Sequence, residues 1–282
     1  AMLRRAATVS AALAGGALTV RVTNESGHKL PTGYPEGRRM WLHVRAWDAQ
    51  RMVVFESGRY VFASATLTPD PHLHLWEARH GISPAVAALT GKPAGASSHL
   101  VLNNVREFDN RIPPRGFTNA AYEAFDGHPV GATYADGQHW DEVVYPVGSA
   151  AVQAEVTLYY QTASREYVEF LRDANTTTAA GLLLYDLWDQ HGRSTPVEMA
   201  RVFVEPDAKR VARCRKTVSK LQARYLKAHL REWSRCYANR AAGLSCDAAS
   251  RDARIAAAAA DLGEKLGGVR DRACAGAGLT PS

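Results

Sequence analysis

The chain has 282 residues, of which 46% are hydrophobic and 22% charged, a composition typical of a folded protein and unlike that of a disordered or fibrous chain. This length allows one large domain or two ordinary ones and excludes a small scaffold held together by disulfides alone. The net charge is +6, and no run approaches the roughly 18 apolar residues that a membrane-spanning helix needs.

The first residues, Ala1-Met2-Leu3-Arg4-Arg5, lack the charged and apolar blocks of a signal peptide. The segment 11–17 is rich in alanine and glycine and too weakly apolar for an export signal. We therefore expect the chain to be the C-terminal piece of a longer precursor.

Residues 1–205 are predicted to be rich in β-strands, because apolar and polar residues alternate with a period of two in several short segments. The candidate strands are 18–23, 40–47, 52–57, 59–65, 72–77, 98–109, 152–160 and 197–205. Short strands separated by turn residues predict an antiparallel β-sandwich, immunoglobulin-like or jelly-roll-like. Two helical stretches, 164–173 and 179–191, are expected against one end of this sandwich.

Charge marks a boundary between Glu205 and Pro206. Residues 1–206 carry 18 basic and 21 acidic groups, a net charge of −3, whereas residues 207–282 carry 16 and 7, a net charge of +9. All four cysteines lie in the basic part. We predict a sandwich domain over 1–205, and a basic helical part over 206–282.

Two apolar stripes with helical spacing predict that the basic part is an antiparallel helical hairpin. One stripe runs from Val211 to Ala228 and the other from Ile255 to Ala273, and Gly243 breaks the pattern between them.

The hairpin also predicts the cysteine pairing. In an antiparallel pair of helices, the numbers of two facing residues have a nearly constant sum, which favours the pairs Cys214–Cys274 and Cys236–Cys246. A bridge from Cys214 to Cys236 would instead have to span ~33 Å of helix. Disulfides imply an oxidising compartment, the periplasm or the cell exterior. The alternative is four buried free thiols, and zinc is disfavoured because no C-x-x-C spacing occurs.

The basic residues of the tail suggest two interpretations. Eleven of them lie between Lys209 and Arg240, and they form either a solvated helix face or a docking surface for an acidic protein or a membrane surface. Nucleic acid is disfavoured, because no known binding motif is present.

Standard catalytic motifs are missing from the sequence. It contains no G-x-S-x-G elbow, no phosphate-binding loop, no H-E-x-x-H zinc helix and no C-x-x-C-H haem attachment site. We therefore predict a non-catalytic chain that carries no covalent haem of its own.

An ordered series of motifs runs through the first two hundred residues: Val22-Thr23-Asn24-Glu25-Ser26-Gly27-His28-Lys29-Leu30-Pro31-Thr32-Gly33, Arg38-Arg39-Met40-Trp41-Leu42-His43, Phe55-Glu56-Ser57-Gly58, Leu102-Asn103-Asn104, Asn110-Arg111-Ile112-Pro113-Pro114-Arg115-Gly116-Phe117, Tyr134-Ala135-Asp136-Gly137-Gln138-His139-Trp140-Asp141-Glu142 and Tyr159-Tyr160-Gln161-Thr162. This series resembles the C-terminal, haem-free region of bacterial multihaem c-type cytochrome proteins, and the resemblance covers about residues 3 to 200. The resemblance implies an exported, redox-associated β-sandwich whose haem c is carried by a missing N-terminal part or by a partner.

By this resemblance, His28 is a candidate haem-iron ligand toward a haem-bearing domain, since neutral imidazole is a common axial ligand. The alternative is an imidazole that bonds the backbone of its own turn, beside Asn24 and Ser26.

Other histidines suggest a copper or zinc site. Trp41 and His43 lie two apart on one strand and share a face, as do His72 and His74, and His80 or His99 could complete a ligand set. Packed aromatic and hydrogen-bonded side chains are the alternative.

The segment around Trp140 allows two further interpretations. Asp136, Asp141 and Glu142 are a candidate calcium site or a polar surface turn, and Trp140 with Trp47 would suit stacking on a sugar. The leading hypothesis is therefore an exported, non-catalytic domain that packs against or docks a haem-bearing redox partner, with electrostatic steering by the basic hairpin. Copper or zinc binding is the alternative, and a carbohydrate-binding module is a weaker one.

Overall fold

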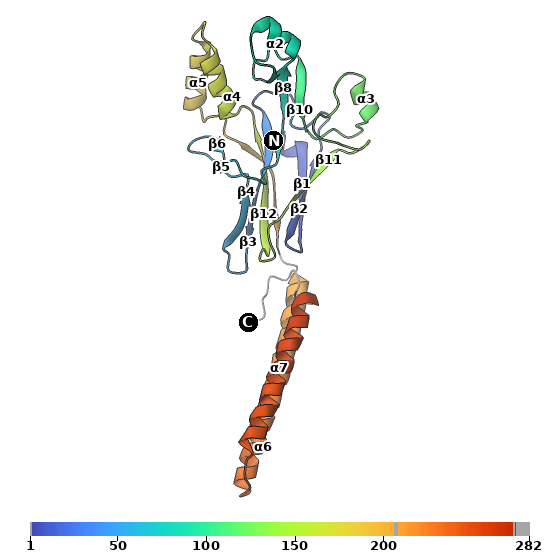
Figure 1. Ribbon diagram of the computed structural model, residues 1–282, viewed down its shortest axis with the longest axis vertical. Helices are drawn as coiled ribbons and strands as arrows, with labels where there is room; N and C mark the ends of the chain where they lie inside the picture. The colour runs from blue at the N-terminus through green and yellow to red at the C-terminus, as the bar shows by residue number, and fades with distance from the viewer. Residues whose placement is uncertain (1, 206–207, 273, 275–282) are drawn as a thin grey trace.

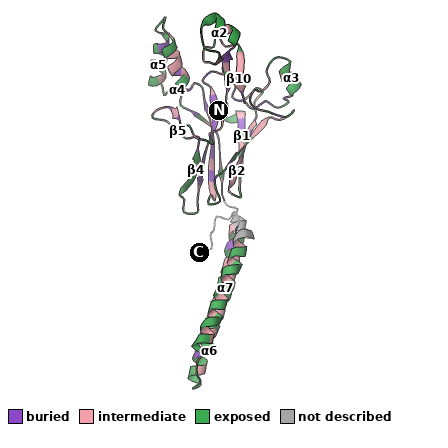
Figure 2. Ribbon diagram, viewed as in Figure 1, coloured by how far each residue is buried: buried purple, intermediate pink, exposed green. Residues whose placement is uncertain are grey.

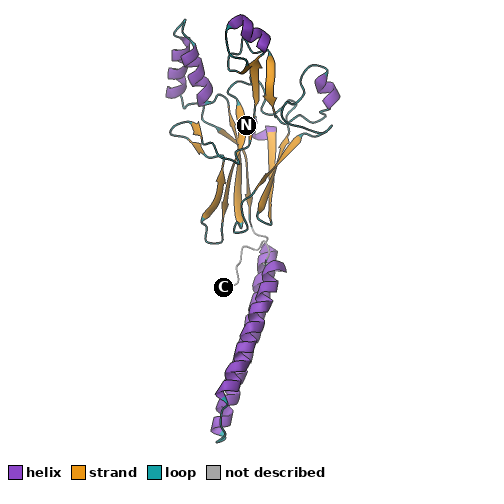
Figure 3. Ribbon diagram, viewed as in Figure 1, coloured by secondary structure: helices purple, strands orange, loops and turns teal. Residues whose placement is uncertain are grey.

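The computed structural model describes residues 2–205, 208–272 and 274 (Figure 1). Strands occupy the chain from Ala7 to Val204, and two long helices occupy most of the remainder (Figure 3). Pro206, the far side of the predicted boundary, lies outside the described residues.

Two antiparallel sheets form the main layers. The first has the order β1-β2-β11, and the second has the order β13-β12-β3-β4, with β7 also paired to β3. The strands are β1 (Ala7–Ala14), β2 (Ala17–Asn24), β11 (Trp140–Tyr145), β13 (Val197–Val204), β12 (Gln153–Gln161), β3 (Arg39–Trp47), β4 (Val53–Ser57) and β7 (Leu75–Trp76).

One apolar core joins the two sheets. Val20 and Val22 of β2 are fully buried in the same cluster as Val44 of β3 and Val156 of β12. These residues alternate with more exposed neighbours because successive side chains of a strand point to opposite faces. The prediction of antiparallel sheets packed around a common core is confirmed.

Smaller elements extend the sheets. They are the sheet β10-β8-β9, with β10 (Val105–Asp109), β8 (Ala78–Ile82) and β9 (Gly95–Ala96), the hairpin β5 (Tyr60–Val61) and β6 (Thr66–Leu67), and the helices α1 (Leu3–Ala6), α2 (Pro84–Thr90), α3 (Asn119–Glu123), α4 (Arg165–Ala174) and α5 (Ala180–Gln190). Helices α4 and α5 lie at one end of the sheets, as predicted (Figure 1), and Trp188 of α5 packs against a second cluster around Trp41 and Tyr60.

Several sequence-based boundaries were wrong. Strand β1 was not among the candidate strands; it pairs with β2 in a hairpin that turns at Gly15 and Gly16 with positive φ. The segments 59–65, 72–77 and 98–109 contain strands of only two, two and five residues. The Asp70 carboxylate explains the second case, because it accepts hydrogen bonds from Ser57, Gly58 and His72 and holds this segment in a turn.

The basic part forms the predicted helical hairpin. Helix α6 (Ala208–Ala241) and helix α7 (Ala248–Arg272) pack side by side as a long rod whose outer surface is mostly exposed (Figure 2). The turn between them contains Gly243 at φ 73°. Disulfides join Cys214 to Cys274 and Cys236 to Cys246, with Cα–Cα distances of 4.9 and 5.0 Å, so the predicted pairing is confirmed.

Among the described residues, neither of these helices nor any other is long and apolar enough to span a bilayer.

Candidate functional site

The loop that carries His28 begins at the end of β2 and is fixed by a buried amide. Asn24 is fully buried, and its Nδ2 lies 2.7 Å from the carbonyl oxygen of His28, 2.9 Å from that of Ile112 and 3.0 Å from that of Pro113. Its Oδ1 accepts from the backbone N–H of Ser26 at 2.8 Å. The loop backbone on both sides of His28 is therefore bound to one side chain.

The two residues after His28 are anchored separately. Lys29 Nζ donates to the Asp109 carboxylate at 2.8 Å, and Leu30 exchanges two backbone hydrogen bonds of 2.9 Å with Ile112. Leu30 is 2% exposed and belongs to the main core. The chain is thus held on the C-terminal side of His28 as firmly as on the N-terminal side.

Asp109 is the centre of a buried charge cluster. Its carboxylate is fully buried and accepts from Lys29 and, at two atoms, from Arg111 at 2.8 Å. Burial raises the pKa of Asp109, but hydrogen bonds and charge from Arg111 and Lys29 outweigh it, so the pKa lies below its ordinary value. Burial in turn lowers the pKa of Lys29, although the hydrogen bond to Asp109 opposes this change.

The His28 side chain itself is exposed. Its imidazole makes no hydrogen bond to any described residue, whereas Asn24 and Ser26 both lie within hydrogen-bond distance of its carbonyl oxygen. The loop also lies beside α1, because the Glu25 N–H donates to Ala6 O at 2.9 Å. The arrangement presents a histidine ring, able to accept a metal, on a rigid support next to the first described residues.

Trp41 and His43 share a face of β3, as predicted, because Tyr159 stacks near both rings, at 5.5 and 6.4 Å. Trp41 is fully buried and donates its indole N–H to Gly58 O. His43 Nε2 lies 3.0 Å from Glu56 Oε1. This face is therefore a second core layer with a histidine–glutamate pair at its edge.

His72 and His74 have different neighbours. His72 lies against Phe55, at 5.4 Å between ring centroids, whereas His74 lies against Trp76, at 4.6 Å, and 3.5 Å from the Asp141 carboxylate. In β4, Phe55 contacts His72, and the next residue, Glu56, contacts His43. Adjacent residues of a strand point to opposite faces. His43 and His72 therefore lie on different sides of β4.

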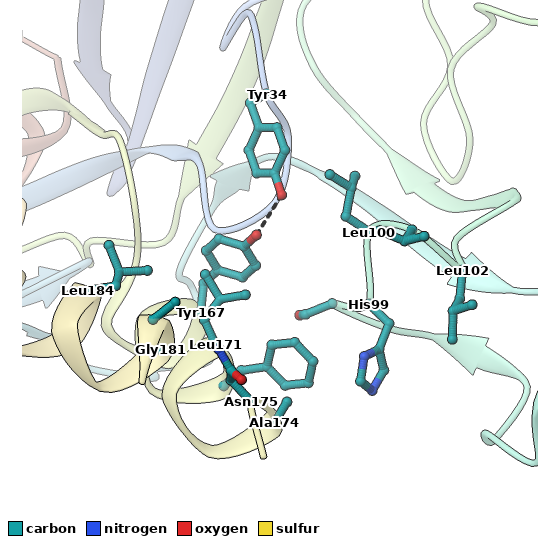
Figure 4. Close-up of a pocket in the computed structure, with 14 residues that line it drawn as sticks. Tyr34, His99, Leu100, Leu102, Tyr167, Leu171, Ala174, Asn175, Gly181 and Leu184 are labelled. Carbon is teal, nitrogen blue, oxygen red and sulfur yellow. Dashed lines mark hydrogen bonds between the residues drawn. The ribbon is translucent and has the colours of Figure 1, made fainter. Parts of the chain in front are cut away.

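His99 lines an apolar cavity of about 470 Å³ between the 98–102 loop and helices α4 and α5 (Figure 4). The hydroxyls of Tyr34 and Tyr167 meet at 2.6 Å on its wall, and burial together with this hydrogen bond raises the pKa of Tyr167. The His99 ring packs edge-on against Phe170. His80 instead pairs with the buried carboxylate of Glu36, at 3.1 Å.

Within residues 2–205, 208–272 and 274, no three His, Cys, Asp or Glu side chains come together as a group that could hold a metal ion. Copper or zinc binding by His43, His72, His74 and His99 with Trp41 stays a prediction.

The acidic residues near Trp140 diverge. Asp136 accepts from Asn119, Asp141 accepts from the Trp76 indole at 2.8 Å, and Glu142 pairs with Arg21. Both tryptophans proposed to stack on a sugar have an arginine over the ring, Arg21 on Trp140 and Arg45 on Trp47, each at 5.1 Å.

Sequence reasoning named His28 but missed the roles of Asn24 and Asp109. The contacts that join this loop to the rest of the fold, Asn24 to Ile112 and Lys29 to Asp109, link residues 88 and 80 positions apart in the chain, so spacing could not reveal them. The signal in the sequence for Asn24 was its place in the motif that contains His28, whereas Asp109 lies in none of the motifs and directly precedes the one that begins at Asn110.

The fold and this loop define an antiparallel β-sandwich protein with a disulfide-linked helical hairpin. No protein-family model matches the sequence, and neither does any curated protein. A solved structure, the penta-haem cytochrome c552 from Thermochromatium tepidum, is loosely similar, with 17% identity and a TM-score of 0.41 over 72% of this chain and 40% of that chain. The chain thus spans less than half the length of that cytochrome. Its own two disulfides indicate a location outside the cytoplasm.

Proposed function

We propose that this chain is an exported, haem-free β-domain, periplasmic in location, that docks against a haem-bearing domain or protein through the loop of His28. In this proposal the imidazole of His28 is an axial ligand to a haem iron held by that partner. The chain itself carries no haem covalently, because it has no C-x-x-C-H motif.

One observation carries the proposal: an exposed imidazole without a hydrogen-bond partner among the described residues stands on a loop fixed at both ends. An axial ligand must supply a free ring nitrogen at a defined position, and a pre-ordered loop reduces the entropy lost on binding. Asn24 donates to the carbonyl oxygen of His28 and not to its ring, so the ring stays free.

The position of the loop beside α1 also supports the proposal. Residues 2–6 approach the loop through the contact of Ala6 with Glu25. A haem domain that preceded α1 in a precursor would join the chain on the side where Ala6 contacts this loop, and a separate cytochrome could reach the same exposed face.

The test uses a haem c peptide with one open axial position, titrated with the full-length oxidised protein and followed by the Soret band. We expect a shift to a low-spin, bis-histidine spectrum for the wild type, and loss of this shift for His28→Ala. The matched control is His72→Ala, which removes another exposed histidine and is expected to bind as the wild type does. Equal binding by the wild type and His28→Ala would contradict the proposal.

A second test is genetic. If the haem domain belongs to the same precursor, the coding sequence directly upstream should contain C-x-x-C-H motifs; if it belongs to a partner, such motifs are expected in a neighbouring gene.

A further inference from the structure

Helix α6 has three distinct faces along its length. At about 100° of rotation per residue, Cys214, Val218 and Cys236 point in one direction, and this face is closed against α7 by the two disulfides. Two further faces occupy the rest of the helix circumference.

The second face is basic. Lys216, Lys220, Arg224, Lys227 and Arg231 follow one another at spacings of 4, 4, 3 and 4, so they form a single row, and all five are exposed. None of them forms an ion pair with a carboxylate of the described residues, whereas elsewhere on the hairpin Arg254 pairs with Glu232 and Lys265 with Asp261. We call these five residues the basic row.

The third face is apolar. Leu226, Leu230, Trp233 and Tyr237 recur at spacings of 4, 3 and 4, and lie about 110° around the helix from the basic row. Leu226 and Leu230 are each 55% exposed and Tyr237 is 62% exposed. Trp233 is partly covered by the Arg251 guanidinium, 3.9 Å from its ring. We call these four residues the apolar row.

We propose that these two rows of α6 dock onto a membrane surface that contains anionic phospholipids. Leucine, tryptophan and tyrosine side chains would enter the boundary between headgroups and acyl chains, while the adjacent lysines and arginines bind lipid phosphates. The long Lys side chains can reach the headgroup level from the edge of the apolar face.

The pairing of the two rows favours a lipid surface over an acidic protein or a second copy. An acidic protein would complement the basic row but would not by itself explain exposed leucines beside it. A second copy of this chain could cover the apolar row, but it would bring a second basic row close to the first, and the like charges would repel each other. A bilayer surface supplies both an apolar phase and negative charge across one plane.

The test is flotation of the full-length, disulfide-bonded protein with vesicles of phosphatidylcholine alone or mixed with phosphatidylglycerol. We expect binding to the mixed vesicles that weakens as salt is added, because screening reduces attraction between exposed charges. Binding to phosphatidylcholine alone is expected to be weaker.

Three double variants separate the contributions of the rows. Lys220→Gln with Lys227→Gln should weaken binding roughly fivefold for each lysine, whereas Arg59→Gln with Lys92→Gln, which removes two exposed cations of the β-part, should leave it unchanged. Leu226→Ser with Leu230→Ser should weaken binding by about tenfold or more. Circular dichroism of each variant checks that the helices are intact.

Quenching of tryptophan fluorescence by brominated lipid provides an independent measurement, and the component lost in Trp233→Phe should be the one that the lipid quenches. Three results would overturn the proposal. The first is no flotation with mixed vesicles, and the second is flotation that Lys220→Gln with Lys227→Gln leaves unchanged. The third is dimerisation in solution, without lipid binding, that Leu226→Ser with Leu230→Ser abolishes. Binding to an acidic protein in place of vesicles would assign the basic row to a protein partner.

Discussion

The side-chain amide of Asn24 lies 2.7 Å from the carbonyl oxygen of His28. Through this bond the buried residue Asn24 fixes the backbone of the exposed residue His28. The same amide bonds the carbonyls of Ile112 and Pro113, so the loop of His28 and the segment after β10 are held as one unit.

Replacing this amide is expected to destabilise the protein strongly. Asn24→Asp keeps the shape of the side chain but replaces its NH2 group, which donates to three carbonyl oxygens, by an oxygen that can only accept. Each buried polar group that is left without a partner costs about 1–3 kcal/mol. We expect a loss of about 3 kcal/mol or more in the free energy of unfolding, measured by urea denaturation. Asn104→Asp, an exposed position, should cost less than about 1 kcal/mol, and His28→Ala should be close to neutral. A neutral Asn24→Asp would show that the loop is not held by this side chain.

The charge cluster at Asp109 leads to a prediction on acid stability. The folded-state pKa of Asp109 is lower than its ordinary value of 3.8, so its ionised form stabilises the fold. This contribution is fully present above pH 3.8 and is lost as pH falls through the lower, folded-state value. Removing the charge with Asp109→Asn leaves Lys29 and Arg111 buried without a carboxylate, which should cost about 3–5 kcal/mol at neutral pH.

Unfolding free energies measured from neutral to acidic pH test this prediction. The difference between wild type and Asp109→Asn should shrink as pH falls from 3.8 toward the lower, folded-state pKa, because the unfolded wild type takes up a proton on Asp109 before the folded protein does. Asp261→Asn, on the exposed surface of α7, should cost less than about 1 kcal/mol. A difference that stays constant with pH would mean that the pKa of Asp109 is the same in the folded and the unfolded protein.

The two disulfides should stabilise the hairpin to different extents. Cys214–Cys274 closes a separation of 60 residues and Cys236–Cys246 one of 10, and the loop-entropy relation assigns them about 4 and 3 kcal/mol. Replacing Cys214 and Cys274 by serine should therefore lower the urea midpoint of the helical circular dichroism signal more than replacing Cys236 and Cys246. The reverse order would contradict a chain-entropy origin of the stabilisation.

The helical hairpin and its disulfides could be predicted from sequence because helical periodicity fixes which residues face each other over many turns. The long strands β3 and β12 were predictable for a similar reason, since apolar and polar residues alternate along them. Strand β1 was missed because its alanines and its one serine give little hydrophobic contrast, and only pairing with β2 makes it a strand.

The candidate site was predictable only in part. The His28 motif is local and stands out in the sequence, but the rigidity of its loop depends on Ile112 and Asp109, which the fold brings from far along the chain. Segment 72–77 contains only a two-residue strand for a similar reason. The Asp70 carboxylate accepts hydrogen bonds from Ser57, which precedes it in the chain, and from His72, which follows it.

Gly58, which belongs to one of the shared motifs, is expected to tolerate no side chain. Its φ is 73°, and a Cβ atom there would lie 2.0 Å from the carbonyl oxygen of Leu42 in β3. Gly58→Ala would thus combine the cost of a left-handed backbone, about 1–2 kcal/mol, with overpacking against a central strand, about 1–3 kcal/mol. Its own carbonyl also accepts the Trp41 indole N–H at 3.1 Å, so a shift of this turn would disturb the second core layer.

Gly116→Ala is the matched control, because Gly116 also has a positive φ, 83°, but open space where a Cβ would lie. It should cost only the backbone term, about 1–2 kcal/mol, whereas Gly58→Ala should cost about 3 kcal/mol or more in urea unfolding. Trp41 fluorescence should change in Gly58→Ala alone. Equal losses for the two variants would mean that the turn at Gly58 moves away from β3 without cost, and that this glycine is needed only for its backbone conformation.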